Sequence, residues 1–308
     1  MPENHGFVGN WTTVDIGLSK DFIQKAECAY YLLTKKRLTE ILKVRSTFDH
    51  KGKFGHALLI AGSFGKMGAA VLATRAALRS GTGLLTVHCP RKGYTILQTA
   101  VPEAMVSVDV DEDYFTLVPD LDAYESIGVG PGIGVNKMVT KALSNLMENF
   151  RKPMVIDADA LNILSSHQEL LALVPEGSIL TPHPGEFKRL VGDWKNGFDQ
   201  MKKQREFSAR LKSVVLVKGA YSAIAVPSGE VFFNPTGNPG MAKGGSGDVL
   251  TGILTSLLAR GYTSLEASQL GCWVHGMAGD LATTERGLEG LIASDLIEKL
   301  PDSFIALQ

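Results

Sequence analysis

The segment from Asn234 to Asp248 carries the clearest chemical pattern in this sequence. It ends in the five residues GGSGD (244–248), and the apolar periodicity after it predicts that a helix follows directly. Successive glycines let backbone N–H groups turn inward into an anion-binding nest, and a helix N-terminus adds unpaired N–H groups and partial positive charge. The loop therefore suits a phosphate, and Asp248 at its rim could take the proton of a substrate hydroxyl. A tight turn with Asp248 as a simple N-cap is the alternative.

Two more polar segments follow apolar runs that are typical of buried strands. Lys218 and Gly219 come after Val214–Val217, where a lysine and a glycine suit a nucleotide phosphate or ribose. The segment DADALN (157–162) carries two carboxylates, Asp157 and Asp159, and either is a candidate for a position near Mg²⁺, although Asp159 could equally cap a helix. An exposed surface lysine and a helix cap are the ordinary alternatives.

The segment TPHPGE (181–186) is stiffened by two prolines and a glycine, which hold His183 and Glu186 beside each other. His183 could hydrogen-bond a substrate amide or phosphate. Glu186 could organise Mg²⁺ through water, the usual way that ion is held. A capped loop that starts a helix is the alternative.

Other glycine-rich or cysteine- and histidine-containing segments do not match a known binding motif. Gly62–Met67 is too short for a phosphate-binding Walker loop, and Gly128–Gly134 lacks the dinucleotide-binding spacing. Cys272 and His275 share a helix face, where packing is a better explanation than metal binding.

Strands and helices that alternate must position these loops. Continuously apolar strands separated by amphipathic helices predict an α/β fold with a mostly parallel sheet covered on both faces. The predicted strands are His56–Ala61, Leu84–Cys89, Ser126–Val129, Met154–Ile156, Ser178–Leu180 and Val214–Val217, and the predicted helices are Ala69–Arg79 and 137–150. Ser222–Pro227 and Glu230–Phe233 predict a hairpin, and helices are expected after Asp248 and over Leu265–Thr283.

Composition excludes several classes of protein. The formal net charge of −1 and the absence of long basic runs disfavour nucleic-acid or anionic-membrane binding. The three cysteines are far apart, an odd count that favours a reducing, cytoplasmic location. No apolar run is long enough to span a bilayer.

Residues 45–308 contain no low-complexity linker and are predicted to form one domain, with residues 1–44 as an N-terminal extension. Trp11–Ile16 in that extension is predicted as a strand followed by a polar helix.

The loops described above, together with Gly130-Pro131-Gly132, resemble the ADP- or ATP-dependent NAD(P)H-hydrate dehydratase family in order and spacing over about residues 45–305. The resemblance implies a ribokinase-like fold, Mg²⁺, an adenine nucleotide as phosphoryl donor, and a homo-oligomer such as a tetramer. It implies phosphorylation of the hydroxyl of the S epimer of NADHX or NADPHX, and then loss of phosphate to restore NADH or NADPH. A small-molecule kinase of the same fold and a non-catalytic nucleotide-binding relative are the alternatives.

The same resemblance assigns roles to individual residues. Asp248 would act on the hydroxyl, and Glu186 and Asp157 would lie near the metal. The nucleotide would contact Lys218, Gly219, Ala220, Tyr221, Ser222, Gly245, Ser246 and Gly247, and the hydrated cofactor would contact Gly68, Ala69, Gly132, His183, Asn238 and Asp248. Ser222 and Lys243 depart from the family pattern without removing a needed group.

Residues 9–18 resemble the last strand of the NAD(P)H-hydrate epimerase domain, which precedes the dehydratase in many bifunctional repair enzymes. We therefore expect this chain to correspond to the C-terminal domain of such an enzyme and to lack epimerase activity. Equilibration of the two hydrate epimers by this chain would contradict that expectation.

Overall fold

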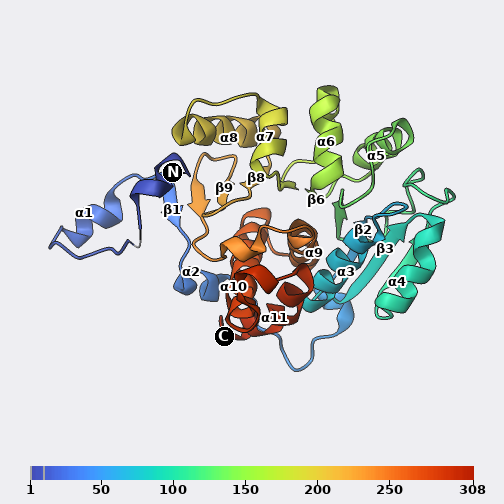
Figure 1. Ribbon diagram of the computed structural model, residues 1–308, viewed down its shortest axis with the longest axis horizontal. Coiled ribbons are helices and arrows are strands. Elements are labelled where there is room, and N and C mark those ends of the chain that lie inside the picture. Colours follow the sequence, from blue (N-terminus) through green and yellow to red (C-terminus); the bar gives the residue numbers. More distant parts are fainter. Residues whose placement is uncertain (1, 10) are drawn as a thin grey trace.

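The computed structural model describes residues 2–9 and 11–308. Across these residues a ten-stranded sheet runs through the molecule in the order β1-β10-β9-β8-β7-β6-β5-β2-β3-β4 (Figure 1). The run from β8 to β4 is parallel throughout, whereas β9 pairs antiparallel with both β8 and β10. The strands are β1 Tyr30–Leu32, β2 His56–Ile60, β3 Leu84–Cys89, β4 Met105–Val108, β5 Ser126–Val129, β6 Met154–Ile156, β7 Ile179–Leu180, β8 Val214–Val217, β9 Ala223–Ala225 and β10 Val231–Phe233.

Helices connect these strands and cover the sheet. They are α1 Lys20–Lys25, α2 Lys35–Ile41, α3 Met67–Arg79, α4 Tyr94–Ala100, α5 Lys137–Asn149, α6 Ala158–Ser166, α7 Pro184–Val191, α8 Gly197–Leu211, α9 Ser246–Ala259, α10 Ser264–Gly290 and α11 Ala293–Ile305. Short 3-10 helices occupy Pro2–Phe7, Lys51–Phe54, Arg91–Gly93, Gln168–Leu173 and Pro239–Met241.

Both faces of the sheet are buried under helices. In β2, Leu58 and Ile60 pack with α5 to α8 on one face, whereas Ala57 and Leu59 pack with α3 on the other. Further along the second face, α9, α10 and α11 supply most of the remaining core. Side chains alternate across a strand, so continuous burial requires cover on both sides. The predicted α/β class is therefore confirmed.

Most predicted elements are confirmed, and the hairpin is β9 and β10. One predicted strand is wrong, because Trp11–Ile16 has no regular structure. The segment is largely exposed and lacks a strand partner, so its apolar and β-branched residues have no sheet to join. The polar helix expected after it is α1, which projects from the body in Figure 1.

Part of the predicted N-terminal extension belongs to the same sheet and core. β1 pairs in parallel with β10, and Leu33 and Leu38 are 1% and 0% exposed in the core beneath α10. The division at residue 44 stays a prediction, although residues 30–41 contribute a strand and a buried helix to the sheet. Among the described residues, no helix combines the length and the hydrophobicity needed to cross a bilayer.

Candidate active site at the carboxyl edge of the sheet

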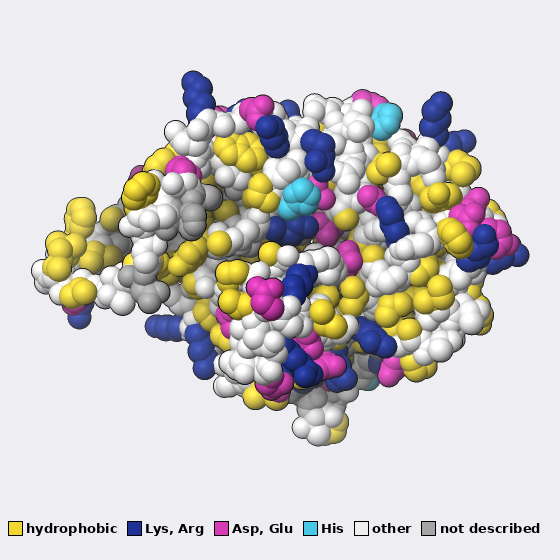
Figure 2. Space-filling view, in the orientation of Figure 1, with side chains coloured by type: hydrophobic (Ala, Val, Ile, Leu, Met, Phe, Trp, Pro, Cys, Tyr) yellow, Lys and Arg dark blue, Asp and Glu magenta, His cyan; other side chains and the backbone are white. Residues whose placement is uncertain are grey.

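The loops singled out in the sequence leave the sheet at one edge. Strands β2, β5, β6, β7 and β8 are neighbours and run parallel, so their carboxyl ends lie side by side. In open α/β sheets this edge is where ligands bind. Charged side chains of both signs gather near the middle of the molecular face shown in Figure 2.

Asp157 is the centre of the polar cluster at this edge. It follows β6 directly and is 1% exposed. Lys218, just after β8, donates from Nζ to Oδ1 of Asp157 at 2.7 Å, and Thr251 of α9 donates from Oγ1 to Oδ2 at 2.7 Å. A buried carboxylate needs such partners, because an unpaired charge there would be strongly destabilising. The pair therefore holds Lys218 at a fixed place at the sheet edge.

The glycine loop delivers Asp248 to this cluster. Gly245 has φ +93°, a left-handed conformation that favours glycine, and α9 begins at the next residue. Asp248 is thus in the first helical turn and is not the N-cap. Burial, followed by the nearby Asp157 carboxylate, raises the pKa of half-buried Asp248 to about 6. That value suits a group that must accept a proton near neutral pH.

Gly247 leaves open the space in front of the ion pair. A Cβ built at Gly247 would lie 3.4 Å from Nζ of Lys218 and 3.7 Å from Oδ2 of Asp157. Behind the loop, Nε2 of His275 lies 2.9 Å from the carbonyl oxygen of Ser246, and burial lowers the pKa of His275 to about 4. The neutral ring therefore donates to Ser246 and supports the loop.

His183 and Glu186 form the start of α7. The backbone N–H of His183 donates to Oε2 of Glu186 at 2.8 Å, and the His183 Nε2 atom lies 3.5 Å from Oε1. Burial raises the pKa of Glu186, against the lowering effect of nearby Lys218. Glu186 is thus buried beside the cluster, whereas the His183 ring is exposed.

The predicted substrate residues in the first turn of α3 and on the β5–α5 loop lie together. A Cβ at Gly132 would lie 3.1 Å from Lys66 Cβ and 3.3 Å from Ala69 Cβ, and Gly68 is the exposed neighbour of Ala69. Asp159 joins the two segments, since its Oδ2 accepts from Gly134 N at 2.8 Å and from Lys66 Nζ at 3.2 Å.

Asn238 lies on the approach to the glycine loop and is held by α10. Its Nδ2 donates to Oδ1 of Asp280 at 3.0 Å, and Gly237 N donates to Oδ2 at 2.9 Å. No hydrogen bond joins the Asn238 side chain to Asp248 or Lys218 in the described part of the chain.

The residues after Lys218 form an exposed turn. Ser222 Oγ accepts from Gly219 N at 3.2 Å and donates to Gly219 O at 2.9 Å. Ala220 and Tyr221 are exposed at its tip, and Tyr221 has φ +55°. The turn presents backbone groups and one aromatic ring to solvent.

Within residues 2–9 and 11–308, no group of three or more His, Cys, Asp or Glu side chains is arranged to hold a metal ion. Both carboxylate oxygens of Asp157 already accept hydrogen bonds. Asp157 therefore fits poorly as a direct ligand. In Glu186, Oε2 accepts from His183 N, so Oε1 is the more available carboxylate oxygen.

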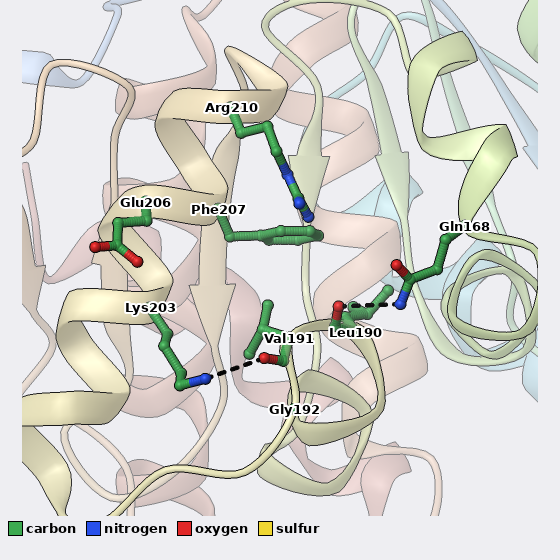
Figure 3. A pocket seen from close by; sticks show the side chains of 8 residues that line it. All are labelled: Gln168, Leu190, Val191, Gly192, Lys203, Glu206, Phe207 and Arg210. Carbon is green, nitrogen blue, oxygen red and sulfur yellow. Dashed lines mark hydrogen bonds between the residues drawn. The ribbon is translucent and has the colours of Figure 1, made fainter.

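A cavity of about 340 Å³ lies elsewhere, between α8 and the C-terminal end of α7 (Figure 3). Its Lys203 donates to Val191 O at 3.2 Å and its Gln168 to Leu190 O at 3.5 Å. These side chains bind the last carbonyls of α7, which accounts for their placement.

Sequence reasoning missed Thr251 and Asp280. Thr251 lies one turn after Asp248 on α9, a spacing that could have indicated a shared helix face. Asp280 is separated from Asn238 by 42 residues and has no local signature.

Comparison with known proteins places this chain in a fold class and then in a family. A ribokinase-like protein from Enterococcus faecalis has 27% identity and a TM-score of 0.78, over 92% of this chain and 98% of that one. The fold thus defines a ribokinase-like α/β protein. The NAD(P)H-hydrate dehydratase family matches residues 57–302. This chain belongs to that family.

Individual relatives agree with this assignment. An ADP-dependent (S)-NAD(P)H-hydrate dehydratase from Neisseria meningitidis is 36% identical over 86% of this chain and 90% of its own length. The ADP/ATP-dependent enzyme from Bacillus subtilis, crystallised with ATP and Mg²⁺, is 30% identical with a TM-score of 0.77, over 90% of this chain and 99% of its own. Bifunctional NAD(P)H-hydrate repair enzymes also match, and the chain spans about half their length.

Proposed function

We propose that this protein catalyses the nucleotide-dependent dehydration of (S)-NADHX and (S)-NADPHX to NADH and NADPH. The observation that carries the proposal is Asp248, half-buried with a pKa of about 6 at the N-terminus of α9, beside the Lys218–Asp157 pair. This arrangement suits a base that works next to a phosphate.

In the first step Asp248 takes the proton of the hydrate hydroxyl. The hydroxyl oxygen attacks the terminal phosphorus of the nucleotide, and the bond from that phosphorus to the bridging oxygen breaks. Backbone N–H groups of Gly245, Ser246 and Gly247, at the start of α9, would stabilise the charge that develops on the phosphoryl oxygens. Lys218 adds a positive charge at the same place.

In the second step the carbon–oxygen bond of the phosphorylated hydrate breaks. Phosphate leaves with the bonding electrons, and loss of a proton from the adjacent carbon forms the ring double bond. Phosphate is a better leaving group than hydroxide, and the nucleotide is consumed to make it. The proton that Asp248 took is available to the departing phosphate.

The adenine nucleotide is proposed to bind residues 218–222, and the hydrated cofactor to lie against Gly68, Ala69, Gly132, His183 and Asn238. The convergence of the β2, β5 and β7 loops supports this assignment. Asn238 would reach the substrate from the Asp280-bound approach loop.

Mg²⁺ would be held mainly by nucleotide phosphates and water, with Glu186 as the nearest suitable carboxylate. The ion would offset phosphate charge when bound. The choice of ADP or ATP, a homo-oligomer such as a tetramer, and a cytoplasmic location are further parts of the proposal. Three free thiols, two of them buried with their pKa raised to about 12, are compatible with a reducing compartment.

Asp248→Asn tests the base directly. We expect this variant to bind ADP within about threefold of the wild type and to lose at least a factor of about 10² in kcat. Isothermal titration calorimetry and single-turnover kinetics measure the two quantities separately. Turnover close to that of the wild type would overturn the assignment of Asp248.

A further inference from the structure

The N-terminal segment reaches the proposed nucleotide-binding turn. Nε1 of Trp11 donates a hydrogen bond to the hydroxyl oxygen of Tyr221 at 3.0 Å, across 210 residues of sequence. Both side chains are about half exposed, at 49% and 47%. Two aromatic rings are thus joined at the rim of the turn and remain open to solvent.

A second contact anchors this segment on the body of the protein. Oε1 of Glu3 accepts a hydrogen bond from the backbone N–H of Gly197, the first residue of α8, at 2.9 Å. Glu3 and Trp11 thus each make a hydrogen bond to the body of the protein.

The turn itself offers an adenine ring little to stack on. Gly219 and Ala220 are small, and Ser222 uses its hydroxyl on Gly219. Within residues 218–222, Tyr221 is the aromatic side chain, and it is exposed with a left-handed backbone that holds the ring at the tip. Purine rings bind best on flat aromatic surfaces, and within the turn Tyr221 alone supplies one ring of such a surface.

We propose that Trp11 and Tyr221 together form an aromatic subsite for the adenine ring of the nucleotide. The N-terminal segment then completes the nucleotide site: Lys218 and the glycine loop hold the phosphates, the turn holds the ribose, and Trp11 supplies the outer wall. This inference rests on the assignment of residues 218–222 to the nucleotide in the proposed function. It adds a binding residue from outside residues 57–302, the part of the chain that matches the dehydratase family.

Two other occupants are possible for an aromatic surface here. The hydrated cofactor also carries an adenine, which could bind here in place of the adenine of ADP. Alternatively, Trp11 could cover the turn and compete with the nucleotide. The two alternatives have different measurable consequences. If the hydrated cofactor binds here, Trp11 affects KM for NADHX; if Trp11 competes with the nucleotide, its removal lowers Kd for ADP.

The test is calorimetric titration of ADP into the full chain and its Trp11→Ala variant, both without hydrate. We expect Kd for ADP to rise about tenfold, the factor that corresponds to ~1.4 kcal/mol of lost stacking. Trp11→Phe keeps an aromatic surface and should restore most of the affinity. Phe22→Ala is the matched control, since Phe22 is 72% exposed on the same segment and should leave Kd unchanged.

Steady-state kinetics then separates the two adenines. Trp11→Ala should raise KM for ADP and leave KM for NADHX within about twofold. An unchanged or lower Kd for ADP, or a rise confined to the KM for NADHX, would overturn the inference. Failure of the wild type to bind either ADP or ATP would instead remove the proposed function, so the two failures are distinguishable.

Discussion

Asp248 is expected to lower the stability of the protein in which it acts. Burial raises the pKa of Asp248 from 3.8 to about 6, so the folded state binds this proton more tightly than the unfolded chain does. The stabilisation that this gives is fully present below about pH 4 and is lost as pH rises through about 6. At 1.36 kcal/mol per pKa unit the full shift is worth about 3 kcal/mol, and partial exposure reduces this to about 1–3 kcal/mol.

Asp248→Asn removes the ionisation and keeps the shape of the side chain. We expect the free energy of unfolding of this variant to exceed that of the wild type by about 1–3 kcal/mol at pH 8 and to match it near pH 4. Urea unfolding at the two pH values measures the difference. Asp122→Asn, at an exposed carboxyl, is the control and should give no such pH dependence. Equal stability of Asp248→Asn and wild type at pH 8 would refute the reasoning.

Four further outcomes are expected. The kcat/KM of the wild type should fall below about pH 6, as Asp248 becomes protonated, and a profile flat to pH 5 would contradict this. Gly247→Ala places a Cβ 3.4 Å from Nζ of Lys218, so calorimetry should show about tenfold weaker ADP binding with an unchanged melting temperature. Thr251→Val leaves one buried oxygen of Asp157 without a donor and should cost about 1–3 kcal/mol in urea unfolding, and a neutral result would count against the network. Asp280→Ala releases the Asn238 loop and should raise KM for NADHX more than Kd for ADP, whereas equal effects would indicate a general loss of structure.

The strands could be predicted from the sequence because buried parallel strands are continuously apolar. β3, β5, β6 and β8 have the predicted bounds. Short edge strands are harder to predict from the sequence. β1 is exposed and is defined by its pairing with β10, and β4 is half-exposed at the other edge of the sheet. Trp11–Ile16 shows the opposite error, since strand-forming residues without a pairing partner stay irregular.

The candidate site shows the same division between local and long-range information. Glycines and prolines mark loops locally, so GGSGD and TPHPGE could be recognised as positions of chemistry. Partners could not be assigned in this way. The bonds of Asp157 to Lys218 and Thr251 span 61 and 94 residues, and they depend on the order of strands in the sheet. The contact of Trp11 with Tyr221 is longer still and has no sequence signature.

The central claim is tested most directly by absorbance at the dihydronicotinamide band, with this protein, hydrated NADH, Mg²⁺ and either ADP or ATP. The account predicts a rise that requires a nucleotide, and the nucleotide that supports it is the phosphoryl donor. No rise with either nucleotide, in protein shown to bind one of them, would contradict the account and favour a small-molecule kinase of the same fold.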